Sequence, residues 1–501
     1  MRSILVTVLL ALSLPLFAAD LPPTISVTAP DVEELDANGN LVFHVTVANI
    51  ATVDVADVTA DFNFNGSFAL VSARGADCAK VSDIGFRCTL PPIAVGKTDD
   101  FDVTFKPPVS HGRLAPSIAV TARVPYVSTV SVFPNAMIYE PFVVTTTADD
   151  GPGSLRQAIA AANRQCVPGV PCRISFAIAE PLPSRGWYTI EPRSPFDPVD
   201  VGEIVIDGRY HNATPVEIRG THALGAGLVM RGGVITVSGL SIDGFFNDGV
   251  VIDQKNPSVF RIANNVIGSD PGGAPVPNGL RGVAVVRGTG AIEDNTIAGN
   301  ARSGIFVTSD LPLRIDANRI TGNGASGIYV GPSNPRVDIA KNVISGNHDF
   351  PIAIDPRATL VAVRDNAMFD NGAPVDIGMD GPGAASAPPS NIIEPAPRIV
   401  TAVYDAASGD TVVTIDVNAL PVHFDTFTIY VYANRALDRA GRAEAETFLG
   451  TVATKTETTV AFRVHADLRG QYVTAMTLRS SEYTESRDEV SSELSDGVVV
   501  R

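Results

Sequence analysis

The 501-residue sequence lacks any block rich in lysine or arginine. Its 54 aspartates and glutamates outnumber 37 lysines and arginines, which gives a formal net charge of −17 at pH 7. A protein that binds nucleic acid needs a cationic surface to displace counterions from the phosphates. The composition therefore argues against a nucleic-acid partner. An acidic surface would also repel a polyuronate, so a neutral or basic glycan is the easier polysaccharide to attract.

Long hydrophobic runs are also lacking beyond the N-terminus. Only there does a positive charge, Arg2, precede an apolar stretch, residues 4–17, and two small residues, Ala18 and Ala19. This pattern predicts a secretory signal peptide over residues 1–19. No later stretch approaches the roughly 18 apolar residues of a membrane-spanning helix. We therefore expect an exported protein without a membrane span, secreted or held at the cell surface, and a monomer.

Cysteine is scarce, with four residues in the chain. Cys78 and Cys88 lie ten residues apart in a strand-rich segment, and Cys166 and Cys172 bracket the sequence VPGVP. An even number of cysteines in an exported chain favours disulfides, and the spacing predicts two local ones, Cys78–Cys88 and Cys166–Cys172. A zinc site is the alternative, but neither a CxxC pair nor a histidine pair at ligand spacing accompanies them.

Helical periodicity is confined to one convincing segment, GSLRQAIAAAN, residues 153–163. Ser154 is the expected N-cap, and Leu155, Ile159 and Ala162 share one helical face. The helix precedes a long β region. We expect it to cover the open end of the first coil of that region, where the core and the strand edges would otherwise meet water.

Asparagine recurs at intervals of 23 to 30 residues in the second half of the chain. The first series is Asn265, Asn295, Asn318, Asn342 and Asn366, and the second, five residues later, is Asp270, Asn300, Asn323, Asn347 and Asn371. Isoleucine, valine or methionine stands three positions before and two positions after each member of the first series. A period of about 20–25 residues built from short strands predicts a solenoid. Three strands per period predict a parallel β-helix with coils about 4.8 Å apart.

The repeated asparagines are expected at the bends of this β-helix. Amides stacked in this way can hydrogen-bond to one another along the axis. We therefore interpret both series as structural rather than catalytic. The aliphatic residues, among them Ile315, Ile320, Ile339 and Ile344, should form a buried column.

Four segments of this region resemble the right-handed parallel β-helix repeat proteins of bacterial secretomes. They are DDGPGSLRQAIAAAN at 149–163, EIVIDG at 203–208, ITVSGLSIDGF at 235–245 and NNVIGSDPGGAPVPNGLRGV at 264–283. The last contains an extra loop, which accounts for the 30-residue interval. With PVDIGMDGPG closing the helix, the resemblance implies a β-helix over residues 142–383.

Period-2 alternation on both sides of this region predicts two β-sandwich domains, over residues 22–140 and 398–501. The N-terminal segments VFHVTVANI and GADCAKVSDIGFRCTLPP resemble the Ig-like conserved-repeat modules (DUF11 type) of bacterial surface proteins, which implies a spacer or stalk. The composition of residues 384–397 predicts a Pro/Ala/Gly linker. The C-terminal sandwich is expected to be Ig- or fibronectin-like. The expected fold class is all-β: a right-handed parallel β-helix with an N-terminal capping helix, flanked by two β-sandwich domains.

Residues that point out of the β-helix are the candidates for a function. In the strand after the second asparagine they are Val251, Ala284, Phe306, Tyr329, Ala353 and Asp376, one per coil. Phe306 and Tyr329 should be neighbours on adjacent coils, and an exposed aromatic pair could stack on sugar rings. The alternative is an aromatic ladder that only stabilises the strands. We name the pair as candidate ligand-binding residues.

A second candidate lies on the strand before the first asparagine. Glu293 and Asp316 should lie one coil apart with Arg314 beside them, at a carboxylate spacing typical of a retaining glycosidase. The two carboxylates could equally hold Ca²⁺. The favoured interpretation is a solvated charged strip in which Arg314 relieves the repulsion. Apart from this possible calcium ion, no cofactor is expected.

Enzyme signatures are missing. The galacturonase set (N-T-D, D-D, G-H-G, R-I-K), the pectate-lyase elements W-x-D-H and R-x-P-x-x-R, and the epimerase D-P-H-D are absent, as are a P-loop and a GxSxG elbow. His211 and His348 are isolated. The sequence therefore favours a secreted, non-catalytic scaffold or adhesin-type protein whose β-helix face binds surface or extracellular glycans. The alternative is a polysaccharide lyase or glycoside hydrolase acting in an outward groove of the β-helix.

Overall fold

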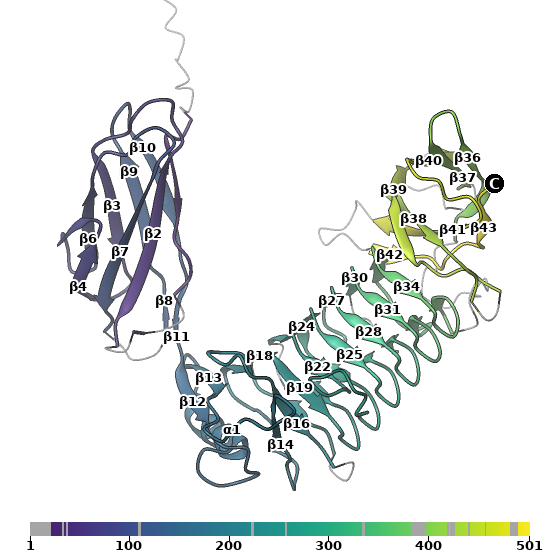
Figure 1. The fold of residues 1–501 in the computed structure, drawn as a ribbon, viewed down its shortest axis with the longest axis horizontal. Coiled ribbons are helices and arrows are strands. Elements are labelled where there is room, and N and C mark those ends of the chain that lie inside the picture. Colours follow the sequence, from purple (N-terminus) through teal and green to yellow (C-terminus); the bar gives the residue numbers. More distant parts are fainter. Residues whose placement is uncertain are drawn as a thin grey trace, which may run out of the picture. The chain divides into compact units, whose positions relative to one another are not determined.

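The computed structural model describes most of the chain, in two compact units, Met1–Tyr139 and Glu140–Arg501 (Figure 1). The described residues are 22–32, 35–36, 39–108, 112–221, 225–255, 258–332, 336–379, 381, 396–417, 420, 426–438, 441–455, 457–480 and 489–501. The predicted signal peptide, residues 1–19, and residues 384–395 of the predicted linker lie outside them. No helix among the described residues is long and apolar enough to cross a membrane.

The first unit is a β-sandwich of two antiparallel sheets. In one sheet the strands follow the order β1 (Ile25–Thr28), β2 (Leu41–Asn49), β7 (Thr98–Lys106) and β4 (Ala69–Arg74). In the other the order is β10 (Ser128–Val132), β9 (Ser117–Ala122), β3 (Val58–Asn63), β6 (Gly85–Leu90) and β5 (Asp77–Lys80), and β8 (Gly112–Leu114) pairs separately with β11 (Ala136–Ile138). Every second residue of β2 is buried, as the period-2 pattern predicts. Phe43, Phe62 and Phe105 pack against one another in the core.

Both predicted disulfides are present. Cys78 and Cys88 occupy directly opposite positions on β5 and β6 and are bonded. Cys166 and Cys172 join the end of the helix to the following strand. The described residues contain no free cysteine.

The second unit begins with the predicted cap. Strand β12 (Glu140–Val144) is followed by α1 (Leu155–Gln165), the only α-helix among the described residues. The Ser154 hydroxyl accepts a hydrogen bond from the backbone N–H of Gln157 at 3.2 Å. Leu155, Ile159 and Ala162 are buried, and α1 contacts β12 and the next strand, β13. The helix therefore covers the apolar end of the β-helix, as its periodicity predicted.

The body of the second unit is a parallel β-helix with three sheets. The first sheet consists of β12, β13 (Pro171–Phe176), β15 (Glu203–Asp207), β18 (Val234–Ser238), β21 (Val259–Ala263), β24 (Thr289–Glu293), β27 (Leu313–Asp316), β30 (Val337–Ala340) and β33 (Val361–Arg364). The second consists of β14 (Tyr188–Ile190), β16 (Val216–Arg219), β19 (Leu240–Asp243), β22 (Val266–Ile267), β25 (Thr296–Ala298), β28 (Arg319–Thr321), β31 (Val343–Ser345) and β34 (Ala367–Phe369). The third consists of β17 (Leu228–Met230), β20 (Val250–Asp253), β23 (Val283–Arg287), β26 (Ile305–Val307), β29 (Ile328–Val330), β32 (Ile352–Ile354) and β35 (Asp376–Ile377).

The interior of the β-helix is filled by rows of aliphatic side chains in register. Ile315 pairs with Ile339 in the first sheet, and Ile320 pairs with Ile344 in the second. All four are 0% exposed and belong to one continuous core. The aliphatic positions on either side of the asparagines therefore face inward, as predicted. Stacking of coils buries what a single coil would leave open.

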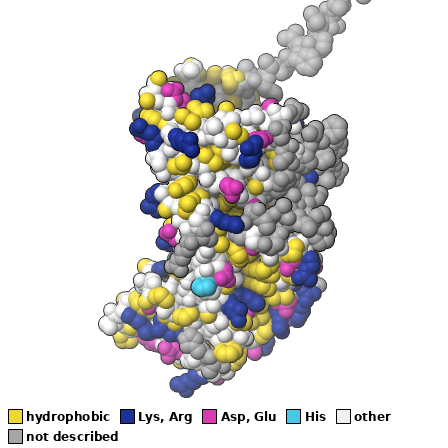
Figure 2. Space-filling model, turned by 90° about the vertical axis from the view of Figure 1, so that its right-hand side faces the viewer, with side chains coloured by type: hydrophobic (Ala, Val, Ile, Leu, Met, Phe, Trp, Pro, Cys, Tyr) yellow, Lys and Arg dark blue, Asp and Glu magenta, His cyan; other side chains and the backbone are white. Residues whose placement is uncertain are grey.

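The C-terminal part of the second unit is a β-sandwich packed on the last coil (Figure 1). One sheet has the order β36 (Arg398–Asp405), β37 (Asp410–Asp416) and β40 (Thr459–Val464). The other has β39 (Thr447–Thr454), β38 (Thr426–Asn434), β41 (Tyr472–Ser480) and β42 (Glu489–Ser491), with β43 (Val498–Val499) also paired to β41. Figure 2 shows basic, acidic and apolar side chains interspersed over the described atoms of the face it presents.

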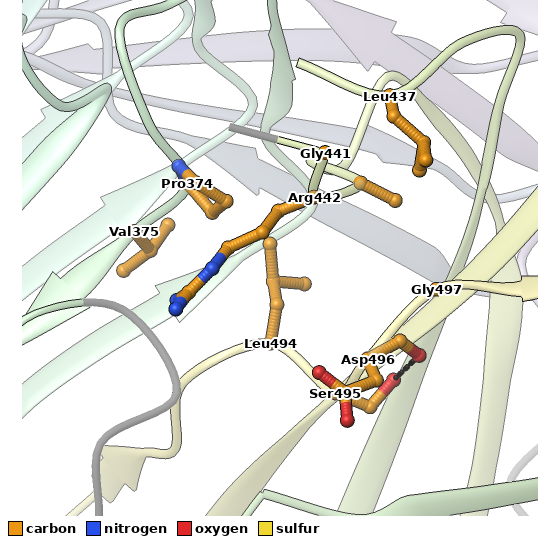
Figure 3. A pocket seen from close by; sticks show the side chains of 10 residues that line it. Pro374, Val375, Leu437, Gly441, Arg442, Leu494, Ser495, Asp496 and Gly497 are labelled. Atoms are coloured by element: carbon orange, nitrogen blue, oxygen red, sulfur yellow. Dashed lines mark hydrogen bonds between the residues drawn. The ribbon is translucent and has the colours of Figure 1, made fainter. Parts of the chain in front are cut away.

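This C-terminal module pairs with the open strand edges of the last coil in all three sheets. Met368 and Ala445 exchange backbone hydrogen bonds of 2.8 and 3.1 Å. Ser491 Oγ accepts from the Val363 N–H at 2.8 Å, and Glu493 Oε1 accepts from the Ile377 N–H at 2.9 Å. A small, partly open cavity also lies at this seam (Figure 3).

Candidate functional site

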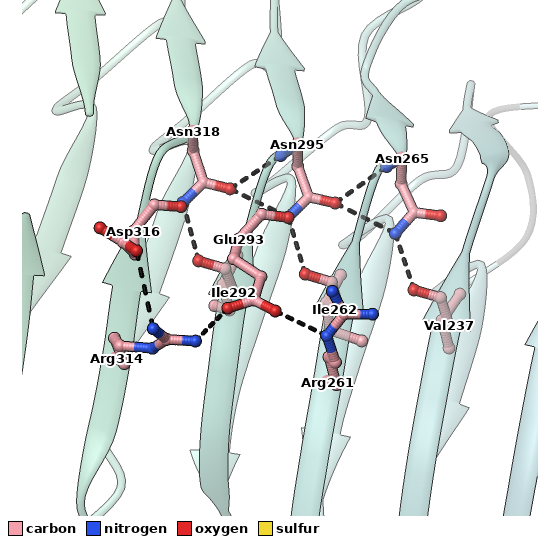
Figure 4. Close-up of polar contacts among 10 residues, drawn as sticks. All are labelled: Val237, Arg261, Ile262, Asn265, Ile292, Glu293, Asn295, Arg314, Asp316 and Asn318. Atoms are coloured by element: carbon pink, nitrogen blue, oxygen red, sulfur yellow. Dashed lines mark hydrogen bonds and ion pairs between the residues drawn. The ribbon is translucent and has the colours of Figure 1, made fainter. Parts of the chain in front are cut away.

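The first asparagine series forms a continuous hydrogen-bonded ladder (Figure 4). Asn295 Nδ2 donates to Asn318 Oδ1 at 2.9 Å and to the carbonyl of Ile262 at 2.8 Å, and its backbone N–H donates to the same Asn318 oxygen. The corresponding side-chain bond joins each neighbouring pair from Asn265 to Asn366. These amides are buried and their hydrogen bonds are used within the ladder, so they are not available to a ligand.

The second ladder differs from the prediction at one member. Asn300, Asn323, Asn347 and Asn371 are stacked as expected, but Asn278 rather than Asp270 occupies the position before Asn300. Asp270 lies in an inserted loop, where its carboxylate accepts from the backbone N–H groups of Gly272 and Ala274. Counting five residues from Asn265 was wrong because the insertion comes between the two ladder positions. The dipeptide Asn278-Gly279, which resembles Asn323-Gly324, was the signal that could have found it.

Phe306 and Tyr329 are paired neighbours on the outer face of the third sheet. Their ring centroids lie 5.2 Å apart and the ring planes differ by 4°. The Arg281 guanidinium lies 3.8 Å from the Phe306 centroid. Arg281 belongs to the preceding coil and Tyr329 to the following one, so they flank Phe306 on opposite faces. We call Arg281, Phe306 and Tyr329 the aromatic row.

The other predicted outward positions of this strand are less exposed than expected. Ala284 and Ala353 are each 1% exposed, and Asp376 is 2% exposed. The two alanines are paired with Phe306 and Tyr329, whose much larger rings shield a methyl group beside them. Asp376 lies on the last coil, which the C-terminal module covers. The side chains of the aromatic row therefore project further from the third sheet than the alanines beside them.

Charged pairs lie at both ends of the aromatic row. Arg281 Nη1 lies 3.6 Å from Asp248 Oδ1, and burial raises the pKa of Asp248. At the other end, Arg357 makes two hydrogen bonds of 3.0 and 3.1 Å to Asp355. These bonds lower the pKa of the Asp355 carboxyl. Burial, followed by the charge of Asp355, raises the pKa of Tyr329, so its hydroxyl stays neutral.

Glu293 and Asp316 are directly paired across β24 and β27, as predicted (Figure 4). Glu293 forms an ion pair with Arg314 and a second one with Arg261, whose Nε lies 2.6 Å from Glu293 Oε1. Arg314 Nη1 also lies 3.6 Å from Asp316 Oδ2. Both oxygens of the Glu293 carboxylate are therefore occupied by guanidinium groups. The geometry therefore favours the interpretation as a charged strip.

Sequence reasoning missed a second carboxyl cluster, on the outer face of the second sheet. Glu217 and Asp243 point outward from adjacent coils, yet both are 0% exposed. Glu217 accepts hydrogen bonds from Thr189 at 2.5 Å and from the indole of Trp187 at 3.2 Å, and it pairs with Arg219. Arg219 Nε also lies 3.3 Å from Asp243 Oδ1. We call these residues the buried acid cluster.

The buried acid cluster is covered by parts of the chain that periodicity does not place. A side chain at Gly272 would come within 3.3 Å of the Trp187 ring, so the inserted loop lies against that ring. Burial, followed by the charge of Glu217, raises the pKa of Asp243 to about 8. Because neither carboxyl is exposed, a polysaccharide does not reach them. Among the described residues, no group of three or more His, Cys, Asp or Glu side chains is placed to hold a metal ion.

A comparison with known protein families agrees with the fold. The family described as "Right handed beta helix region" matches residues 226–385. A cohesin module of a family 33 glycoside hydrolase from Clostridium perfringens ATCC13124 is 11% identical, with 23% of this chain and 96% of that chain covered and a TM-score of 0.18. The enzymatically active domain of bacteriophage CBA120 tailspike protein 2 is 9% identical, with 72% of each chain covered and a TM-score of 0.26.

A third solved structure is the catalytic domain of a GH87 alpha-1,3-glucanase in complex with nigerose. It is 10% identical, with 71% of this chain and 88% of that chain covered and a TM-score of 0.15. No curated protein matches the sequence. The family match and the three parallel sheets define the chain as a right-handed parallel β-helix protein. At these low TM-scores the solved structures add nothing about its ligand.

Proposed function

We propose that the protein is an exported, non-catalytic scaffold whose β-helix binds a neutral glycan at the outer face of the third sheet. The observation that carries this proposal is the aromatic row of Arg281, Phe306 and Tyr329. Phe306 and Tyr329 are partly exposed, and accessible aromatic rings with a few polar groups nearby are typical of sugar-binding surfaces. The N-terminal sandwich would then act as a spacer.

Tyr329 is the member of the row that offers a ring face. Both faces of Phe306 are occupied, by Arg281 and by Tyr329. The second face of Tyr329 turns toward the next coil, where the paired residue is only Ala353. We expect a pyranose ring to stack on the exposed part of the Tyr329 ring. Arg357, four residues after Ala353, has a largely exposed side chain that supplies donors for the sugar hydroxyls.

Export is supported by the chemistry of the chain. Two disulfides persist where the environment is oxidising, outside the cytosol. The N-terminal residues have the pattern of a signal peptide. The interspersed charges of Figure 2 suit a protein that meets neutral polymers rather than a polyanion.

A glycan array with the unchanged protein and three variants tests the proposal. Phe306→Ala with Tyr329→Ala should weaken glycan binding about tenfold or more, roughly 1.4 kcal/mol, because the stacking surface is lost. Glu293→Gln with Asp316→Asn should bind like the unchanged protein. Tyr329→Phe is the matched control, since it keeps the ring and removes only the hydroxyl.

Product assays on the same samples test the alternative, a polysaccharide-cleaving enzyme. Reducing ends would report a glycoside hydrolase, and the absorbance of unsaturated sugars would report a polysaccharide lyase. Turnover that disappears in the Glu293/Asp316 variant and survives in the Phe306/Tyr329 variant would overturn the proposal. It would place an active site on the charged strip.

A further inference from the structure

The seam between the last coil and the C-terminal module contains a partly open cavity of about 240 Å³ (Figure 3). One wall is Pro374 and Val375 of the last coil, and the others are Leu437, residues 441–443 and residues 494–497 of the module. Typical pockets for drug-sized ligands measure roughly 300–1,000 Å³. The cavity therefore suits one small ring rather than a polymer.

The cavity has an apolar side and a charged side. Val375, Ala443 and Leu494 are buried residues that contribute apolar lining. Figure 3 shows the Arg442 side chain extending past Leu494 toward Pro374 and Val375, while Asp496 lies on the opposite side of Leu494. A ligand between them would meet a cation at one end and a hydrogen-bond acceptor at the other.

Arg442 is held at its backbone and not at its guanidinium. Its N–H donates to Asp438 Oδ1 at 2.8 Å, and its carbonyl accepts from the Asp438 N–H at 2.6 Å, which fixes the turn. No carboxylate of the described residues forms an ion pair with the Arg442 guanidinium. Guanidinium groups bind carboxylates through paired hydrogen bonds, so this side chain is free to hold an external one.

We propose that this cavity binds a single acidic sugar unit, with its carboxylate on Arg442, its ring against Leu494 and Val375, and its hydroxyls donating to Asp496. The net charge of −17 disfavours a polyanion at the surface, but one carboxylate beside one free guanidinium is accommodated. The site is separate from the aromatic row. Because its walls come from the β-helix and from the module, a bound ligand would also stabilise their contact.

Titration of the whole protein with D-glucuronate, followed by calorimetry and by thermal unfolding, tests the site. Saturable binding in the millimolar range and a rise in Tm are expected, and D-glucose at the same concentration should give neither. Arg442→Ala should abolish binding, and Arg442→Lys should weaken it several-fold because the paired geometry is lost. Arg463→Ala is the matched control, since Arg463 is an exposed arginine of β40 that does not line the cavity.

The outcomes separate this site from the proposed function. The Phe306/Tyr329 variant should bind glucuronate unchanged, so loss of glycan binding at the aromatic row leaves this result standing. Equal binding of glucose and glucuronate, unchanged binding by Arg442→Ala, or the absence of saturation with glucuronate would each overturn the proposal. Unchanged Tm of ligand-free Arg442→Ala would show that the variant folds.

Discussion

Single residues hold the bends of the β-helix in left-handed backbone conformations. Gly299, Gly322 and Gly346 directly precede members of the second ladder and have φ values of +63° to +70°. Ala317 and Lys341 directly precede members of the first ladder, at φ 55° and 56°. A side chain in this region costs roughly 1–2 kcal/mol relative to glycine. The first row of bends is therefore strained, whereas glycine relieves the second row except before Asn371, where Asp370 has a φ of 57°.

Gly322→Ala isolates this backbone effect. No atom lies within 4 Å of the position a Cβ would take at Gly322, so only the φ of +63° opposes the substitution. We expect the free energy of unfolding in urea to fall by about 1–2 kcal/mol. Ala317→Gly is the control and should be neutral or stabilising, because Ala317 is exposed and has a positive φ. Destabilisation by Ala317→Gly as large as that by Gly322→Ala would contradict the explanation.

The sequence predicted the residues of the ladders because recurrence is visible in a one-dimensional pattern. The error at Asp270 shows the limit, since a fixed spacing does not survive an insertion between two ladder positions. The sequence also predicted the pairing of Phe306 with Tyr329. It did not predict Arg281 above the Phe306 ring, because long side chains reach positions that strand register does not fix.

Among the elements, two segments cover part of the outer face of the second sheet. They are the inserted loop that contains Asp270 and the segment around Trp187. Glu217 and Asp243 are carboxyl groups on outward positions that these segments bury. Periodicity indicates the face on which a side chain lies but not what covers that face. For this reason the buried acid cluster could not be predicted, although its residues alternate as outward positions should.

The cluster should make stability depend on pH through Asp243. Its pKa of about 8 in the folded chain lies above the usual 3.8, so the folded state favours the protonated form. This contribution is complete below pH 3.8 and is lost as pH rises toward and through 8. Asp243→Asn cannot ionise beside Glu217. We expect its free energy of unfolding at pH 9 to exceed that of the unchanged protein by at least about 1 kcal/mol.

Urea unfolding at pH 6 and pH 9 measures this effect. The advantage of Asp243→Asn should shrink at pH 6, where Asp243 keeps its proton. Asp349→Asn is a matched control because Asp349 is largely exposed. An advantage of Asp243→Asn that is the same at both pH values would show that ionisation is not the cause.

In the whole molecule, the two ends of the β-helix are closed in different ways. The N-terminal end is closed by α1, and the C-terminal end by a sandwich that contacts the strand edges of the last coil in all three sheets. The segments AEAETFLGTV and SSELSDGVVV supply these contacts. Alternation predicted the C-terminal sandwich as a whole, but not the strands of these two segments. Their capping role was not predicted either, because it depends on which module edge meets the last coil.

Removal of the C-terminal module should therefore lower the solubility of the β-helix. A chain of residues 140–381 would expose the edges of β33, β34 and β35, and open edges pair with other chains. We expect it to form aggregates or higher oligomers in size-exclusion chromatography with light scattering. The chain 140–501 is the control and should stay monomeric, since it contains one complete compact unit. A monomeric, cooperatively unfolding 140–381 would contradict the capping role.

The second asparagine ladder is a one-way row of aligned dipoles. Each side-chain N–H points toward the C-terminal end, so Asn347 donates to Asn371, and Asn371 Nδ2 donates to Glu444 Oε2 of the module at 2.7 Å. At the other end Asn278 Oδ1 accepts from the Phe245 N–H. The row therefore ends in partial positive charge at a carboxyl group whose pKa burial raises to about 7. Each coil adds one amide dipole to the row, and Glu444 lies at its positive end. An anion at the N-terminus of an α-helix has the same position relative to the helix dipole.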